Sequence, residues 1–423
     1  MTSAVALLTS RPFRQAMLMN FLFFMGMNLF LLLPIHVQQM GGDEADVGLV
    51  QGAYSLAGIL FQPLVGLWVN RLGRGFFMRL GALLLALSAA GLVFSHSIPL
   101  HAALRAVQGL AFSAFFVANY IHIVDLSPVE RRGWALGIFG LSGLMSTALA
   151  PLLGEAVLRQ ASFRWCFVLA ALLAAGSFAI ILRTKGIRPP APGGGPGLAE
   201  LREGLQEVLR VHMVLGFFFG LGTGTVFTFL PTFAEQLGVT GLGFFYTAYA
   251  TSAVAARVFG GDLIDTQGRR AVIVPCMIIF TAAVCIFALL AGAVGPGVRV
   301  PVLPFIFLAG FLGGGAHGFL YPALSALLVD VTPDTRRASA VGIFSAVCLL
   351  GNAVGAVAFG YIALGAGYSP MWTALVVILC GGITASRRVA PGPGAVRVSE
   401  SLSAARAAAT ARSAAAAELR ADR

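Results

Sequence analysis

Charged residues are scarce in this chain. Asp, Glu, Lys and Arg make up 11% of its 423 residues, whereas a soluble domain carries about 25%. Hydrophobic residues reach 58%, and apolar runs of about 20 residues, each long enough to cross a bilayer, recur along the sequence. A single soluble core does not absorb so many apolar segments. The composition excludes an ordinary soluble domain and predicts an all-α membrane protein.

The signatures of metal, disulfide and nucleotide chemistry are also missing. No CxxC pair and no clustering with histidine occurs among the cysteines, which lie in apolar stretches at Cys166, Cys276, Cys285, Cys348 and Cys380. This pattern predicts no disulfide and no metal site. The P-loop pattern GxxxxGK[ST] is absent as well, which argues against ATP drive from this chain. We therefore predict that the protein is not an enzyme and holds no cofactor.

Hydrophobic periodicity predicts twelve membrane spans, six on each side of a segment rich in proline and glycine. Their approximate ranges are 14–38, 46–69, 76–95, 99–124, 134–158, 163–182, 212–236, 241–264, 271–294, 301–330, 338–364 and 368–386. An amphipathic pattern follows the Pro/Gly segment and is typical of a helix on the membrane surface. We predict a first bundle at 1–182, a cytoplasmic linker with an amphipathic helix at 183–211, a second bundle at 212–386 and a disordered tail at 387–423.

The two halves repeat each other at two places. The first repeated passage contains Asp125, Arg131 and Arg132, which are matched in the second half by Asp330, Arg336 and Arg337. The other passage follows the second predicted span and contains Gly66, Asn70, Arg71, Gly73 and Arg74, matched by Gly261, Asp265, Gly268 and Arg269. Two similar halves in a strongly apolar chain indicate a transporter that moves solute between them.

Basic residues are distributed unevenly about the predicted spans. Of the 28 lysines and arginines, Arg105 and Arg257 fall inside spans, and Arg159, Arg164 and Arg299 fall in loops on one side. The others gather on the opposite side, which the positive-inside rule assigns to the cytoplasm. We predict an inner (cytoplasmic) membrane protein with both termini in the cytoplasm, and the net charge of +11 then needs no nucleic-acid partner.

The repeated loops have the chemistry of a gate. One glycine lets helices approach closely, and a second permits a tight turn. The arginines can pair with a carboxylate or with the carbonyls at a helix C-terminus when the cytoplasmic side is shut. We predict that these residues form a cytoplasmic gating motif.

The loop pattern resembles the G-x-x-x-D-[RK]-x-G-[RK] signature of the major facilitator superfamily, and the resemblance covers nearly the whole chain. It implies a fold of twelve transmembrane helices in two pseudo-symmetric six-helix bundles. This chain departs from the signature because Asn70 occupies the acidic position of the first copy, whereas Asp265 keeps it in the second. Either Asp125 or the neutral Asn70 would have to replace the missing carboxylate.

The fourth predicted span carries a polar and aromatic stripe with helical spacing. Its members are Arg105, Gln108, Phe112, Phe115, Asn119 and His122. An arginine inside a membrane is costly and is expected to face a cavity or a partner, although Arg105 is near enough to the helix end to extend outward to water. The surrounding Leu-Arg-Ala-Val-Gln-Gly is similar to a superfamily motif whose arginine is associated with proton-coupled members.

Three other spans carry polar stripes, and in this superfamily the first, fourth, seventh and tenth helices line the cavity. Together with the fourth span, the stripes predict a substrate and proton pathway that includes Asn20, Phe24, Asn28, Thr225, Thr228, His317 and Tyr321. The charge of His317 can switch near physiological pH, so it is a candidate for carrying a proton or binding substrate. The alternatives are a structurally satisfied histidine and polar contacts that serve helix packing.

The fifth predicted span contains Pro151, Gly154 and Glu155. The passage is similar to the G-P-x-x-G-G motif of the superfamily's antiporters, with Ala150 and Glu155 in place of glycines. Proline and glycine make a helix bendable and closely packable, so we expect a helix-bending motif here. Glu155 is expected to be solvated near the outer end.

These features predict a secondary transporter that works by alternating access, most similar to the efflux branch of the superfamily and driven by protons. Few charges and several aromatic residues suit a neutral or amphipathic organic solute, and Arg105 would also admit an anion. The expected partners are a small-molecule substrate, protons and the lipid bilayer, with the protein acting as a monomer. Uptake and lipid movement remain alternatives, as does a receptor or assembly protein on the same fold.

Overall fold

The computed structural model describes residues 9–128, 132–184, 187, 211–239, 241–293, 301–331 and 337–389. The first half comprises α2 (Arg11–Asn28), η1 (Leu29–Leu32), α3 (Leu33–Gln39), α4 (Glu44–Leu72), α5 (Arg74–Val93), α6 (Ile98–Leu126), α7 (Arg132–Gln160) and α8 (Phe163–Arg183). The second half comprises α10 (Val211–Gln236), α11 (Gly243–Thr266), α12 (Arg269–Ala293), α13 (Val302–Val331), α14 (Arg337–Ala366) and α15 (Tyr368–Ser386). Apart from a few residues at its edges, the predicted linker lies outside the described residues, and so does the predicted tail beyond Val389.

The helices of the described residues reproduce the predicted spans to within a few residues. Eleven of them are long and apolar enough to cross a membrane, the first being the combined stretch Arg11–Gln39. The 24-residue helix α11 completes the twelve-helix arrangement. Large apolar side chains are exposed on the flank of the bundle, among them Leu60, Phe94 and Phe259, as expected where lipid replaces water. The predicted all-α membrane fold is confirmed.

The first span is not one continuous helix, contrary to the prediction for 14–38. The α-helix α2 gives way at Asn28 to the 3₁₀ turn η1, after which α3 resumes. Pro34 has no backbone N–H and therefore cannot continue the hydrogen-bond ladder toward residue 30. The Asn28 side chain is also engaged elsewhere, because its amide donates to Ser146 at 2.9 Å and to Thr147 at 3.1 Å.

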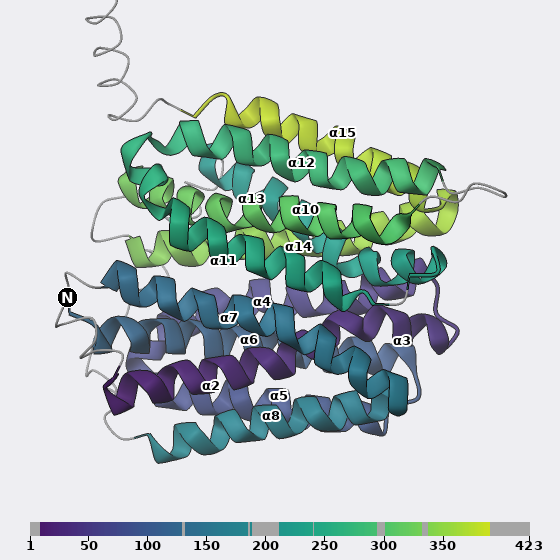
Figure 1. Ribbon diagram of the computed structural model, residues 1–423. Helices are drawn as coiled ribbons and strands as arrows, with labels where there is room; N and C mark the ends of the chain where they lie inside the picture. The colour runs from purple at the N-terminus through teal and green to yellow at the C-terminus, as the bar shows by residue number, and fades with distance from the viewer. Residues whose placement is uncertain are drawn as a thin grey trace, which may run out of the picture.

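Helix pairing is the same in both halves. In the first half α2 packs on α7 and α8, α6 packs on α4 and α5, and α5 packs on α8. In the second half α10 packs on α14 and α15, α13 packs on α11 and α12, and α12 packs on α15. The halves meet through two matching pairs, α4 with α14 and α7 with α11 (Figure 1). The molecule is therefore a pair of pseudo-symmetric six-helix bundles.

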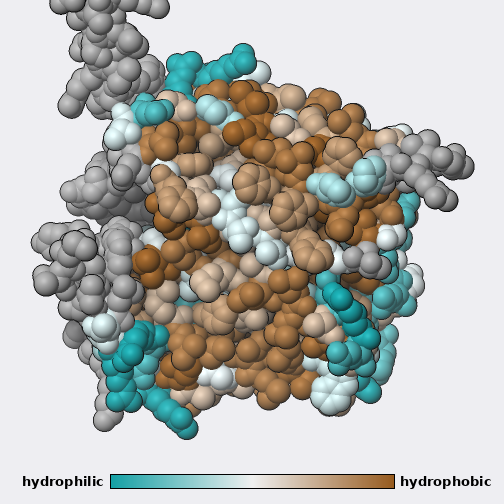
Figure 2. Space-filling model, in the orientation of Figure 1, coloured by the Kyte–Doolittle hydropathy of each residue, from teal (hydrophilic) through white to brown (hydrophobic). Residues whose placement is uncertain are grey.

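The bundle has two chemically distinct ends, which we name for use below. The linker end is where α2 begins and where α8 and α15 end, and the far end is where α3 ends and α4 begins (Figure 1). Figure 2 shows hydrophobic residues over most of the visible flank, with hydrophilic residues gathered toward the ends. This distribution is the one expected of a protein whose flank faces a bilayer.

Contacts between the halves are most intimate at the far end. There α3 and η1 lie against α10, and Gly48 of α4 approaches α14 so closely that an added Cβ would lie 2.3 Å from the carbonyl oxygen of Ala356. At the linker end, a Cβ added to Gly66, Gly137 or Gly342 meets no atom of the described residues within 4 Å. The described contacts thus hold the halves together mainly at the far end.

Candidate functional site: a central polar group between two gates

Polar side chains from both halves meet near the middle of the bundle. Arg257 lies just past the midpoint of the 24-residue helix α11, and His317 lies at the middle of the 30-residue helix α13. The hydroxyl of Tyr249 and Nδ1 of His317 form a hydrogen bond. Tyr321 is one turn further along α13 and lies within electrostatic reach of Arg257 and of Tyr120 in α6. We call Tyr120, Arg257, His317 and Tyr321 the central group.

Members of the central group are partly exposed although they lie deep within the bundle. On the first-half side, Phe24, Phe112 and Phe116 are also partly exposed. Phe24 meets Phe112 edge to face with ring centroids 6.1 Å apart, and Phe112 stacks on Phe116 at 5.3 Å. Phe24 of α2 and Phe112 of α6, two aromatic residues predicted for the pathway, therefore lie side by side, and α6 also supplies Tyr120.

Arg257 reaches across the boundary between the halves. A Cβ added to Gly140 of α7 would lie 2.6 Å from Nη1 of Arg257, so the guanidinium occupies the space that a side chain at position 140 would fill. Among the described residues no carboxylate lies within 4.0 Å of Arg257, and its Nε is buried without a hydrogen-bond partner. Tyr249, His317 and Tyr321 supply its described electrostatic neighbours.

Arg105 is enclosed within the first half and does not extend outward to water. It is 6% exposed, its Nη1 donates to Oε1 of Gln108 at 2.6 Å, and its Nη2 donates to Oε1 of Gln51 in α4 at 2.6 Å. The guanidinium lies over the ring of Tyr54 at 4.6 Å, a favourable cation–π arrangement. The predicted pair Arg105 and Gln108 is thus brought together, but the described partners of this cation are neutral.

The asparagines of the predicted pathway tie three helices of the first half together. Asn119 of α6 donates to Asn20 of α2 at 3.1 Å, and Asn20 in turn donates to Ser142 of α7 at 2.6 Å. Both asparagines are buried. Such hydrogen bonds between transmembrane helices stabilise packing, so the geometry accounts for these side chains without a ligand.

The two threonines of α10 are also buried. The hydroxyl of Thr225 donates to the backbone carbonyl of Leu221 at 2.8 Å, and a Cβ added to Gly355 of α14 would lie 2.7 Å from that hydroxyl oxygen. Thr225 therefore packs against α14. Thr228 lies one turn further along the same helix.

At the linker end the first copy of the gating motif forms an ion pair. Nε of Arg74, at the start of α5, lies 2.6 Å from the carboxylate of Asp125, near the end of α6. Gly73 and Gly268, which precede α5 and α12, have φ values of 88° and 87°, the left-handed conformation that glycine adopts most readily. Asp125 is thus positioned to serve in place of the carboxylate that Asn70 lacks.

Much of the remaining gating motif lies outside the described residues. Arg131 and Arg336 lie outside the described residues. The structure describes only the backbone at Asn70, Arg132, Gly261, Asp265, Asp330 and Arg337. Their predicted contribution to the gate stays a prediction.

At the far end, Glu155 connects the halves. Helix α7 continues through Pro151 to Gln160, and Gly154 packs on Leu32 of η1. The Glu155 carboxylate accepts a hydrogen bond of 2.9 Å from the backbone N–H of Gly243, the first residue of α11. Its side chain is 14% exposed, so the expectation of a solvated carboxylate is wrong. A negative charge at a helix N-terminus is favourable, and Glu155 therefore acts as a latch between α7 and α11.

Replacing Glu155 with glutamine is expected to loosen the far end. The substitution keeps the shape but removes the charge, which weakens the hydrogen bond by about 1 kcal/mol and raises the open fraction about fivefold. Hydrogen exchange measured by mass spectrometry should show faster exchange in the segment containing Gly243. Glu235→Gln, which neutralises an exposed far-end carboxylate, is the matched control. Equal hydrogen-exchange rates in wild type and Glu155→Gln would show that Glu155 does not hold α7 and α11 together.

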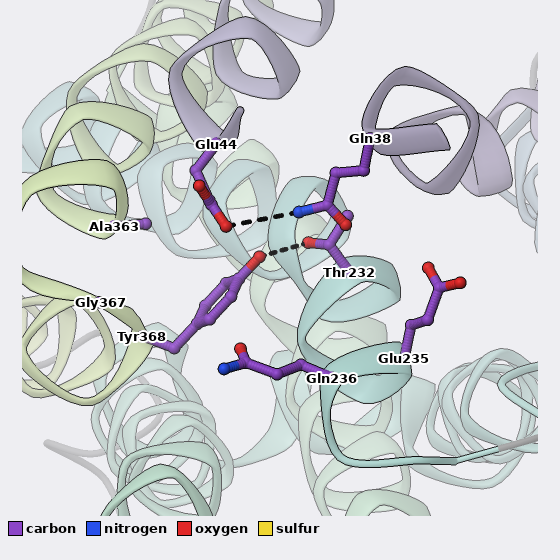
Figure 3. A pocket seen from close by; sticks show the side chains of 8 residues that line it. All are labelled: Gln38, Glu44, Thr232, Glu235, Gln236, Ala363, Gly367 and Tyr368. Carbon is purple, nitrogen blue, oxygen red and sulfur yellow. Dashed lines mark hydrogen bonds between the residues drawn. The ribbon is translucent and has the colours of Figure 1, made fainter. Parts of the chain in front are cut away.

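A cavity of about 360 Å³ also lies at the far end, between the halves. Figure 3 shows Gln38 and Glu44 directed toward each other across it, with their amide and carboxylate 3.4 Å apart, and the Tyr368 hydroxyl donating to Thr232 at 2.7 Å. Glu235 and Gln236 of α10 complete its polar wall. The cavity lies at the end of the bundle, away from the central group, and we interpret it as a vestibule of the closed end.

Comparison with a family model decides the assignment. The model of the Major Facilitator Superfamily matches the chain twice, over residues 16–242 and over residues 213–420. The chain belongs to the major facilitator superfamily. The double match follows the two halves, and the family assignment makes this protein a membrane transporter. The resemblance predicted from the loop motifs is thereby confirmed.

Individual relatives agree with this assignment. The staphylopine export protein of Staphylococcus aureus is 24% identical over 391 residues, which cover 88% of this chain and 92% of that protein. The quinolone resistance protein NorA of Staphylococcus aureus is 32% identical over 145 residues, 34% of this chain and 35% of NorA. The crystal structure of the nucleoside transporter NupG superimposes with a TM-score of 0.70 at 14% identity, covering 90% of this chain and all of NupG (100%). That similarity shows the superfamily fold.

Several residues of the candidate site were not predicted from the sequence. Arg257 was placed inside a span but not assigned to the pathway, although the cost of an intramembrane charge was a sufficient signal. Gln51, Tyr54 and Tyr249 lie on spans that carried no predicted polar stripe. Only the packing of α4 on α6 and of α11 on α13 shows that they touch Arg105 and His317.

Proposed function

We propose that this superfamily member exports a small organic solute from the cytoplasm in exchange for protons, by alternating access. The observation that carries the proposal is the central group. It joins Tyr120 of the first half to Arg257, His317 and Tyr321 of the second near the middle of an apolar bundle. Substrate sites of such transporters lie near the midplane at the interface of the repeats.

Two further observations support the direction of transport and the orientation. The similar proteins of Staphylococcus aureus are named for export and for drug resistance. The positive-inside rule assigns the arginine-rich linker end to the cytoplasm, in the cytoplasmic membrane. With that orientation, the far-end contacts describe a state that is closed to the outside. The protein would work as a monomer, because each chain contains both halves.

His317 is the proposed proton carrier. It lies at the middle of α13, is partly exposed, and is hydrogen-bonded to Tyr249. An imidazole at this place can gain a proton from one side and lose it to the other as the halves rock. Tyr249 would hold the ring in one orientation through both steps.

The test uses purified protein in liposomes with an acidic lumen. The probes are naphthyl-substituted carboxylates, amides and amines, and lumenal pH is followed with a dye. Export by exchange predicts that at least one probe accumulates in the lumen while lumenal pH rises. Protein-free liposomes set the background, which is highest for amines because protonation traps them. His317→Ala should retain exchange of labelled for unlabelled probe but lose most of the dependence on the pH gradient.

Three outcomes would contradict parts of this proposal. Absence of protein-dependent flux for every probe would reject transport of this solute class. Flux driven only by a proton gradient of the opposite direction would indicate uptake. An unchanged pH-driven flux in His317→Ala would reject His317 as the proton carrier.

A further inference from the structure

We infer that Arg257 recognises an anionic group of the substrate, so that the preferred solute is an organic carboxylate. This inference rests on the proposed transport function and specifies the substrate class of the same site. The middle of the bundle holds the cation Arg257, for which the described residues supply no counter-ion.

The placement of Arg257 is unlike that of a structural arginine. A charged side chain inside a membrane is costly and normally pairs with an opposite charge. Arg257 lies just past the midpoint of α11, and no described carboxylate is within 4.0 Å. Its Nε is buried without a hydrogen-bond partner. The described surroundings therefore leave the charge of the guanidinium without a counter-ion.

The guanidinium is also positioned where both halves can contact one ligand. It fills the space over Gly140 of α7, and the described groups with which it interacts electrostatically are the hydroxyls of Tyr249 and Tyr321 and the imidazole of His317. Arginine presents its N–H groups in a planar fork that matches a carboxylate. Tyrosine hydroxyls nearby can donate to the same oxygens.

Arg105 also lacks a carboxylate partner among the described residues and also has an unpaired Nε, but the rest of its guanidinium is occupied. Its two amino groups donate to Gln51 and Gln108 at 2.6 Å each, and its plane is covered by Tyr54. It is 6% exposed, whereas Arg257 is partly exposed. Of these two cations, Arg257 is the more accessible to a solute.

The aromatic side chains around the central group favour a substrate that has an apolar part. Phe112 and Phe116 of α6 are partly exposed beside Tyr120, and Phe219 packs edge to face on His317 at 4.9 Å. Rings of this kind favour an aromatic or aliphatic body over a strongly hydrated one. The inferred substrate is therefore an amphipathic carboxylate with its charge at Arg257.

The experiment measures binding separately from transport. Thermal stabilisation of the purified full-length protein is titrated with three matched probes: 1-naphthaleneacetate, 1-naphthaleneacetamide and 2-(1-naphthyl)ethylamine. A ligand that binds the folded state raises the melting temperature, and at a given concentration the rise increases with the logarithm of its affinity. We expect the carboxylate to bind about tenfold more tightly than the amide, as a charge-assisted hydrogen bond allows, and the amine to bind least.

Variants identify the residue responsible. Arg257→Gln should bind carboxylate and amide equally, and Arg257→Lys should retain part of the preference because it keeps the charge. Arg183→Gln, which removes an exposed arginine at the end of α8, should bind as wild type does. If Arg257 had only a structural role, its replacement would weaken the binding of both probes alike. A change in the ratio of the carboxylate affinity to the amide affinity therefore indicates direct recognition of the charge.

The inference is overturned if the wild-type carboxylate binds no more tightly than its amide, or if Arg257→Gln leaves the ratio unchanged. Failure of the transport proposal is a different result. In that case the carboxylate binds selectively, but the liposome assay shows no protein-dependent flux for any probe.

Discussion

Replacing Gly48 with alanine is expected to reduce transport strongly, because it separates the two halves where they are most closely packed. A Cβ at this position would lie 2.3 Å from the carbonyl oxygen of Ala356 and 3.2 Å from its carbonyl carbon. The obstacle is backbone, so no side chain can rotate away. Forcing atoms into such a contact costs about 1–3 kcal/mol, which is enough to shift a two-state equilibrium by about fivefold to a hundredfold.

Small residues recur around Gly48 where α4 meets α14. Gly48 faces Ala356 and Gly360 of α14, and Gly52, one turn further along α4, faces Ala353 and Val357. Small residues at this spacing allow two membrane helices to approach until their backbones touch. The contact holds the halves together at the far end, so its loss disfavours the state that is closed at that end.

Two measurements on Gly48→Ala check the prediction. Probe flux in liposomes should fall, and hydrogen exchange should accelerate in the first turns of α4 and in the facing part of α14. Gly176→Ala is the matched control, because a Cβ there meets its nearest atom, Cδ1 of Leu22, at an ordinary 3.6 Å. Wild-type flux and exchange in Gly48→Ala would show that closure of the far end does not depend on this contact.

Replacing Arg105 with methionine is expected to raise thermal stability and to abolish most transport. The guanidinium is enclosed at 6% exposure, and its described hydrogen-bond acceptors are the neutral amide oxygens of Gln51 and Gln108. Burying a charge without a counter-ion costs several kcal/mol, and removing it outweighs the ~1–3 kcal/mol for each amide oxygen left without its donor when the two glutamines can turn toward other donors. A residue that lowers stability in this way is retained for function.

Melting temperature in detergent and probe flux in liposomes should therefore change in opposite directions for Arg105→Met. Arg79→Met, which removes an exposed arginine of α5, should change neither to a comparable degree. If Arg105→Met instead lowers the melting temperature together with flux, Arg105 is a packing element between α4 and α6 and has no separate role in transport.

Much of the fold was predictable because the bilayer imposes a simple rule on sequence. Every span must satisfy its own backbone and present apolar side chains to lipid, and both requirements are local. The interruption of the first span was missed although Pro34 was a local signal for it, whereas the hydrogen bond from Asn28 to Ser146, more than a hundred residues away, had no such signal. The burial of Glu155 had no local signal either, since Gly243 belongs to the other half.

The predicted pathway residues also divide into those that the sequence placed correctly and those that it did not. Helical spacing correctly placed Arg105 beside Gln108 and Phe24 near Phe112. Spacing also grouped Asn20, Asn119 and Thr225 with the pathway, and the structure shows them engaged in packing between helices. A polar stripe indicates which face of a helix is turned inward, but it does not distinguish a cavity wall from a helix–helix contact.

By itself, the sequence of this protein determined that it crosses the membrane, that its halves are related, and which loops carry the repeated arginines. Those properties follow from hydropathy and repetition, which are written along the chain. The tertiary structure alone decided that Asp125 pairs with Arg74, that Glu155 joins α7 to α11, and that Arg257 lies over Gly140 without a described counter-ion. Each of these depends on which helix packs against which, and charges that are distant in sequence interact only after packing brings them together.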